Sequence, residues 1–330
     1  MRTDVTFSSN GLKISGCLYL QDEGQDNARD KARDHARDHA RDDANAAPRP
    51  AVVVGHPGSG VKEQAAGLYA RRLAEEAGFV TLAFDAAYQG ESEGEPRGLE
   101  DPAQRVEDLK SAVSFLTTHP AVDPNRIGVL GICASGGYSL AAAAGDHRIR
   151  AVATVSGVDI ARQFKVGADG SQDPAVFQSM LDAAASARTA EARGEGVQRF
   201  DLFPASEQEA RLGGPHVYGG WEYYCTPRAA HPRSAKALTW SSVDRMAAFD
   251  AFAAVGLIAP RPLLLIAGRE AVTSWMSVEA YQSTRGPKEL HWIDGASHVD
   301  FYDKDEYVTP AIAKLAEFYQ VHLGHAEGRE

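Results

Sequence analysis

A short apolar run that enters a glycine-rich turn constrains this chain more than any other feature. Residues 127–130 form the run, and residues 131–137 read Gly-Ile-Cys-Ala-Ser-Gly-Gly. A buried strand that ends on small residues and leads into a helix makes a tight turn, because the helix must pack close to the strand behind it. The side chain at the tip of such a turn is presented to a ligand. The segment therefore predicts a strand, a turn and a helix, with Cys133 at the tip as a candidate nucleophile.

A second frame of the same turn would place Ser135 at the tip. That frame requires the strand to continue through Cys133, whereas Gly131 already closes the apolar run. The strand-then-turn context therefore favours Cys133 over Ser135 as the nucleophile. A buried structural cysteine is the remaining interpretation, since free cysteine is among the most buried residue types. The surrounding glycines suit a turn better than a strand interior.

Composition and charge narrow the expected partners and location. The net charge of −11 disfavours nucleic acid and anionic membranes as partners, which leaves a small molecule as the expected one. Cys17, Cys133 and Cys225 show no metal-binding spacing, so we expect neither a disulfide framework nor a metal site. The first residues lack the apolar segment of a secretory signal, and no apolar run approaches membrane-spanning length. We therefore expect a cytoplasmic protein, with its oligomeric state open and a homo-oligomer among the alternatives.

Strands and helices alternate over most of the chain. Residues 3–9 and 13–20 predict a hairpin that turns at Asn10-Gly11. Residues 21–48 include a repeated Ala-Arg-Asp tract that cannot bury a core, so we expect a solvated low-complexity insertion there. From Ala51 onward the alternation predicts a mostly parallel sheet with helices on both faces.

The alternation stops between residues 157 and 249. This segment combines an alanine-rich helical pattern with an aromatic, proline-punctuated run, and we interpret it as a cap inserted into a core of residues 1–156 and 250–330. Ligands bind open α/β sheets beyond the carboxyl ends of the strands, where this cap would lie. Most of its aromatic residues would form the cap's own core, and a few would line a pocket. The predicted substrate contacts are Tyr88, Tyr218, Trp221 and Trp275.

A thiol nucleophile needs a base, a group that orients the base, and donors for the oxyanion. His298 is the predicted base, because it follows the last predicted strand in a Gly-Ala-Ser-His loop. The orienting carboxylate is expected at Glu270, in the loop after the strand that ends at Gly268. Asp159 is the alternative acid, and Asp300 is a further one.

The oxyanion hole is expected to use two backbone amides. One is the N–H of Ala134, directly after the nucleophile, and the other comes from the loop at residues 55–60. Pro57 has no N–H, so Gly58 or Ser59 must supply the second donor, and Gly58 is our choice.

On these residues the chain resembles the α/β-hydrolase superfamily, and within it the dienelactone-hydrolase-like branch that includes relatives of polyketide transferases. The resemblance rests on residues 55–60, 85–92, 131–137 and 294–298, and it spans nearly the whole chain apart from the Ala-Arg-Asp tract. It implies an α/β-hydrolase fold and a cofactor-free triad with a cysteine nucleophile, which Cys133 and His298 match. One position departs from the pattern, because related sequences often carry Asp where this chain has Val272.

The predicted function is hydrolysis of a carbonyl ester, thioester or lactone through an acyl-enzyme on Cys133. The base would be His298 and the acid Glu270 or Asp159. One alternative is an acyl or polyketide transferase that uses the same residues. Another is a hydrolase-like protein that binds a small ligand without catalysis. A redox-sensing thiol is a further interpretation, since an activated thiolate oxidises readily.

Overall fold

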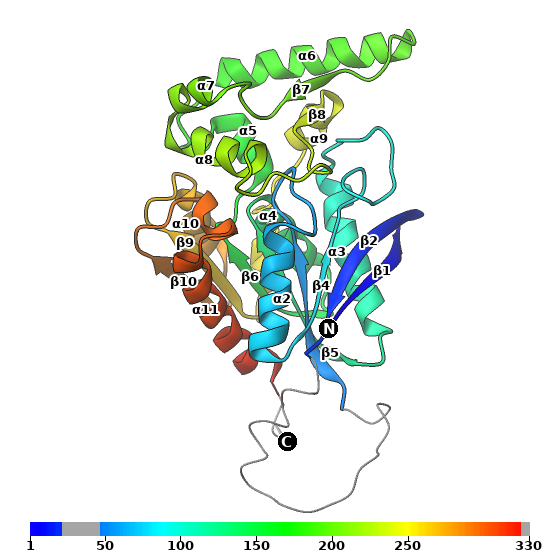
Figure 1. Cartoon of the computed structure of the whole chain (residues 1–330), viewed down its shortest axis with the longest axis vertical. Coiled ribbons are helices and arrows are strands. Elements are labelled where there is room, and N and C mark those ends of the chain that lie inside the picture. Colours follow the sequence, from blue (N-terminus) through cyan, green and yellow to red (C-terminus); the bar gives the residue numbers. More distant parts are fainter. Residues whose placement is uncertain (22–46, 325–330) are drawn as a thin grey trace, which may run out of the picture.

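An eight-stranded sheet forms the centre of the molecule, in the order β1-β2-β4-β3-β5-β6-β9-β10 (Figure 1). The computed structural model describes residues 1–21 and 47–324. The Ala-Arg-Asp tract of the predicted insertion lies outside these residues.

The sheet begins with an antiparallel hairpin. β1 (Arg2–Ser9) pairs with β2 (Leu12–Tyr19), and β2 continues antiparallel onto β4 (Val80–Phe84). Asn10 and Gly11 connect the two strands with φ values of 47° and 81°, as a tight hairpin turn of this hand requires. The hairpin predicted at this dipeptide is confirmed.

The other strand pairs in the sheet are parallel, so the predicted mostly parallel sheet is confirmed. The inner strands β3, β4, β6 and β9 are mostly buried, as expected where helices cover both faces, whereas the edge strand β10 is mostly half-buried. The remaining parallel strands are β3 (Arg49–Gly55), β5 (Val122–Ile132), β6 (Ile149–Val155), β9 (Leu263–Gly268) and β10 (Lys288–Ile293).

Helices cover the two faces of the sheet. α2 (Ala65–Ala77) packs with α11 (Asp305–Leu323) on one face, and α3 (Pro102–Thr117) packs with α4 (Ala134–Gly145) on the other (Figure 1). Asp101 caps α3, with Pro102 as the first helical residue, a residue pair typical of a helix start. α10 (Ser274–Ser283) follows β9, and the short helices η1 (Val255–Ile258) and η2 (Val299–Tyr302) complete the core. Within the described ranges, no helix combines the length and apolar character needed to cross a membrane.

The chain between β6 and β9 forms a separate layer above the sheet, which we call the α5–α9 segment (residues 160–247; Figure 1). Its longest helix packs on α9 through a small core around Phe177, Ala184 and Val243. Its elements are α5 (Ile160–Val166), α6 (Pro174–Ala192), β7 (Arg199–Asp201), α7 (Glu207–Leu212), α8 (Gly214–Cys225), β8 (Ala237–Thr239) and α9 (Ser241–Ala247).

The turn from β5 to α4 depends on very close backbone packing. Cys133 adopts φ 54° and ψ −120° and directly precedes α4. A Cβ atom on Gly136 would lie 2.5 Å from Cα of Gly157, and one on Gly137 would lie 2.7 Å from the carbonyl oxygen of Val158. Glycine therefore lets the start of α4 touch the segment that leaves β6.

This packing predicts a difference in stability between two glycines of the same helix. Gly136→Ala should lower the free energy of unfolding by about 1–3 kcal/mol, because the added methyl group overlaps the backbone of Gly157. Gly145→Ala is the matched control, since a Cβ there meets nothing closer than Lys110 Nζ at 3.7 Å. This control should leave the stability unchanged or up to about 1 kcal/mol higher. Urea unfolding followed by circular dichroism measures both, and equal stabilities would contradict the close packing.

Candidate active site

A cavity of about 470 Å³, the central cavity, lies between the sheet and the α5–α9 segment. Residues that follow the carboxyl ends of strands line its floor, among them Gly58 after β3, Cys133 after β5 and His298 after β10. α5, β7 and α8 supply much of the opposite wall. The volume and position are those of a small-molecule site in an open α/β sheet.

Cys133 stands at the tip of the β5–α4 turn and lines the central cavity. Ser135 lies two residues after Cys133, is buried inside α4 and outside the cavity lining, and donates its hydroxyl proton to the carbonyl oxygen of His56 at 2.6 Å. Arg105 also donates to the Ser135 hydroxyl. Of the two frames of the turn, the geometry therefore favours Cys133 as the nucleophile.

The thiol of Cys133 lies beside the two backbone amides that we expected to form the oxyanion hole. The backbone N–H groups of Ala134 and Gly58 and the hydroxyl of Tyr302 are its polar neighbours, and each of them lowers the pKa of the thiol. Burial nevertheless raises the pKa of the Cys133 thiol, against the opposing effect of these three groups. The resting thiol is therefore protonated at neutral pH. Backbone amides beside a sulfur nucleophile are donors of the kind that can stabilise an oxyanion.

His298 is buried, and both of its ring nitrogens face hydroxyl groups. Nδ1 lies 2.6 Å from Oγ1 of Thr273 and 2.9 Å from Oγ of Ser156, while Nε2 lies 3.0 Å from Oη of Tyr302. Burial, together with the nearby ring of His216, lowers the pKa of His298 to about 3. The imidazole is therefore neutral and able to accept a proton.

Hydroxyl groups replace the predicted carboxylate at His298. Glu270 is exposed to solvent, and Asp159 caps α5, where it accepts hydrogen bonds from the N–H groups of Ala161 and Ala251. Asp300 accepts from the N–H of Ser297 and pairs with Lys304. Within the described residues, none of these carboxylates hydrogen-bonds to the imidazole.

The reason for this difference lies in the loop after β9. Val272, the position at which the family resemblance led us to expect Asp, is 38% exposed, whereas the next residue, Thr273, is 1% exposed and turns inward to His298. A carboxylate at position 272 would face solvent in this conformation of the loop.

Sequence reasoning missed three functional candidates, Ser156, Thr273 and Tyr302, although each carried a signal. Ser156 directly follows β6 and adopts φ 48°, which is unusual for a residue other than glycine and typical of functional sites. Thr273 follows the Val272 position, and Tyr302 is four residues after His298, one turn along η2. A hydroxyl residue at the carboxyl end of a parallel strand is a candidate ligand contact in its own right.

The four aromatic residues predicted to contact substrate do not line the central cavity. Tyr218 and Trp221 stack on each other along α8, the indole N–H of Trp275 donates to the carbonyl of Ala168, and Tyr88 lies against Gly94 in its own loop. Other aromatic residues line the cavity instead. They are Phe164, Phe200, Phe203, Tyr224 and Tyr302.

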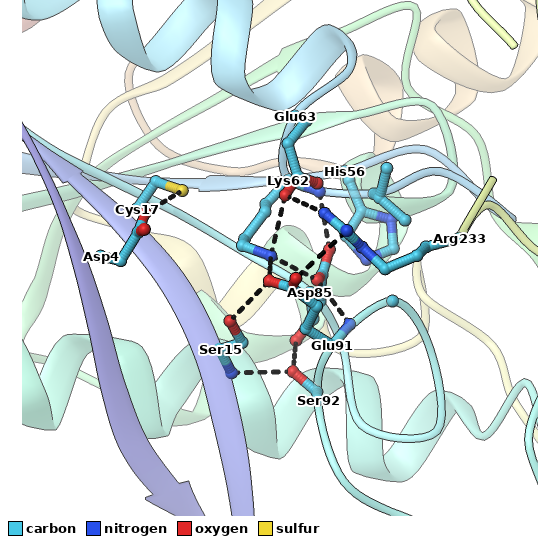
Figure 2. Close-up of polar contacts among 12 residues, drawn as sticks. Asp4, Ser15, Cys17, His56, Lys62, Glu63, Asp85, Glu91, Ser92 and Arg233 are labelled. Carbon is cyan, nitrogen blue, oxygen red and sulfur yellow. Dashed lines mark hydrogen bonds and ion pairs between the residues drawn. The ribbon is translucent and has the colours of Figure 1, made fainter. Parts of the chain in front are cut away.

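A buried lysine holds the loop that supplies the second amide donor (Figure 2). Lys62 is 1% exposed, and its Nζ lies 2.8 Å from Asp85 and 2.6 Å from Glu91. Its backbone N–H also donates to Asp85. Arg233, between α8 and β8, pairs with Glu63 at 2.5 Å and with Glu91 at 3.2 Å. This network therefore fixes the loop and links it to the α5–α9 segment.

Comparisons with known proteins agree over most of the chain. The model of the dienelactone hydrolase family matches residues 39–183, which include Gly58 and Cys133. The uncharacterized Escherichia coli K12 protein YcjY is 41% identical over 274 residues, or 83% of this chain and 89% of the relative. The thiohydrolase aneE of Aspergillus aculeatus is 28% identical over 258 residues, or 76% of this chain and 78% of the relative. The crystal structure of the α/β hydrolase GrgF from Penicillium superposes with a TM-score of 0.76 at 21% identity, covering 98% of this chain and 100% of that chain.

Proposed function

The chain belongs to the dienelactone hydrolase family of α/β-hydrolases, which act on ester bonds, and we propose that it works through an acyl-enzyme on Cys133. The observation that carries this proposal is the position of the thiol, which lines the central cavity at the tip of the β5–α4 turn beside two backbone amides.

In the proposed reaction the sulfur attacks the acyl carbon while its proton is transferred to Nε2 of His298. The carbonyl oxygen becomes an oxyanion and accepts hydrogen bonds from the N–H groups of Ala134 and Gly58. The imidazolium then protonates the leaving alcohol or thiol, and a thioester remains on Cys133. Water, deprotonated by the neutral His298, hydrolyses this thioester and restores the free thiol.

The lining of the central cavity supports an ester or thioester with a neutral, apolar acyl group. Its walls include Ile160, Phe164, Met180, Phe200 and Leu202. The charged side chains that line it are both acidic, Glu100 and Asp201, and in the described part of the chain no Lys or Arg does so. A carboxylate on the acyl group would therefore be desolvated without a cationic partner.

Transfer of the acyl group to an alcohol or thiol is the second candidate function. The largely apolar wall favours it, because an organic acceptor can bind beside the acyl-enzyme and displace water. Adding an alcohol or thiol during turnover distinguishes the two: an acyl product on the acceptor shows transfer, and free acid alone shows hydrolysis.

The acyl-enzyme is tested by intact mass spectrometry with peptide mapping after brief exposure to p-nitrophenyl octanoate. One octanoyl group should appear on Cys133 and disappear on standing. Cys133→Ala and His298→Ala should give no adduct, because the first lacks the sulfur and the second lacks the proton acceptor. Ser135→Ala is the matched control and should still form it, since Ser135 lies outside the cavity. An adduct on Ser135, or none on the wild type, would contradict the proposed nucleophile.

The charge preference is tested with two esters of equal chain length. The kcat/KM for p-nitrophenyl octanoate should exceed that for the mono-p-nitrophenyl ester of octanedioic acid by about 100-fold or more. The physical reason is the cost of burying an unpaired carboxylate beside acidic side chains. Initial rates of p-nitrophenol release measure both constants. Equal constants would show that the acyl group does not enter the apolar part of the cavity.

A further inference from the structure

Tyr302 occupies the position between the proposed nucleophile and its base. Its Oη lies 3.0 Å from Nε2 of His298, and the same hydroxyl is a polar neighbour of the Cys133 thiol, whose pKa it lowers. In the described residues, Cys133 and His298 share no direct hydrogen bond. All three side chains line the central cavity, and Tyr302 is 2% exposed. The structure thus contains a chain of contacts from sulfur to phenol oxygen to imidazole nitrogen.

The groups that contact the imidazole determine the direction in which a proton can move along these contacts. Thr273 and Ser156 place hydroxyl oxygens at Nδ1, which can accept a hydrogen bond from an Nδ1–H group. In that tautomer Nε2 carries no proton and accepts a hydrogen bond from the Tyr302 hydroxyl. A lone pair of the phenol oxygen is then free to accept the S–H of Cys133.

The ring of Tyr302 is held in place by other aromatic rings. Tyr223 packs edge-on against it at a centroid distance of 5.1 Å, and Tyr224 does so at 6.5 Å. Burial raises the pKa of Tyr302 well above its ordinary value, so the phenol keeps its proton. A fixed, neutral hydroxyl between a donor and an acceptor is suited to passing a proton without holding a charge.

We propose that Tyr302 relays the thiol proton of Cys133 to His298, an inference that rests on the proposed acyl-enzyme. In this step the S–H bond breaks as a new O–H bond forms on Tyr302. The original O–H bond of Tyr302 breaks as an N–H bond forms at Nε2 of His298. The products are a thiolate and an imidazolium, and Tyr302 is neutral before and after. Its new hydroxyl proton then donates to the thiolate, which is the group that attacks the acyl carbon.

The relay is tested by single-turnover acylation with p-nitrophenyl octanoate in the full-length enzyme. Tyr302→Phe should slow octanoyl transfer to Cys133 by about 100-fold or more, because general acid–base assistance is lost. Tyr223→Phe is the matched control: it removes a neighbouring hydroxyl that lies outside the cavity lining, so the acylation rate should stay near wild type. Circular dichroism and urea unfolding establish that both variants are folded.

A proton inventory separates a relay from a purely structural role. Acylation rates are measured in mixtures of H2O and D2O. For the wild type, a plot of the acylation rate against the deuterium fraction should be curved, because two protons move in the rate-limiting step. For Tyr302→Phe, the same plot of the residual rate should be linear. Acylation of Tyr302→Phe at the wild-type rate, or a linear wild-type inventory, would overturn the relay alone. Absence of any adduct on wild-type Cys133 would overturn the proposed function and the relay with it.

Discussion

The backbone conformation of Cys133 is the constraint on which the rest of the site depends. A residue other than glycine at φ 54° costs of order 1–3 kcal/mol, and it persists only where the surroundings fix it. Here Gly136 allows α4 to contact the segment after β6, and this contact holds the turn closed. The same turn aims the thiol into the central cavity and leaves the N–H of Ala134 free for an oxyanion. Ser59 and Ser156, which also have positive φ, lie beside it in the loops after β3 and β6.

Two hydroxyl groups in place of a carboxylate change how His298, the proposed base, would work. A carboxylate at Nδ1 would stabilise an imidazolium by its charge, whereas Thr273 and Ser156 orient the ring without supplying one. Burial then keeps His298 neutral and Cys133 protonated in the resting enzyme. The thiolate and the imidazolium are therefore expected only when substrate is bound and the oxyanion amides are engaged. This arrangement also limits oxidation of the thiol between turnovers, because the thiolate is the reactive form.

Features fixed by local sequence could be predicted, and contacts made across the sheet could not. The hairpin at Asn10-Gly11, the capped start of α3 and the turn at Cys133 follow from backbone requirements of a few adjacent residues. His298 could be singled out in the sequence because it follows the last predicted strand. The residue that contacts Nδ1 of His298 could not be identified from the sequence, because it depends on whether residue 272 or residue 273 turns inward after β9. Likewise, whether an aromatic residue lines the cavity depends on how the α5–α9 segment packs on the sheet. The aromatic content of that segment does not determine this packing.

The central claim is that a neutral thiol, a phenol and a neutral imidazole form one hydrogen-bonded chain in the resting enzyme. The most direct measurement is ¹⁵N NMR of the His298 imidazole, assigned by comparison with His298→Gln. The account predicts a neutral ring with its proton on Nδ1 at every pH from about 5 to 8, because the pKa of His298 is about 3. An imidazolium signal at neutral pH that becomes neutral in Cys133→Ala would contradict it. That result would mean that the thiolate and the imidazolium already exist as an ion pair before substrate binds.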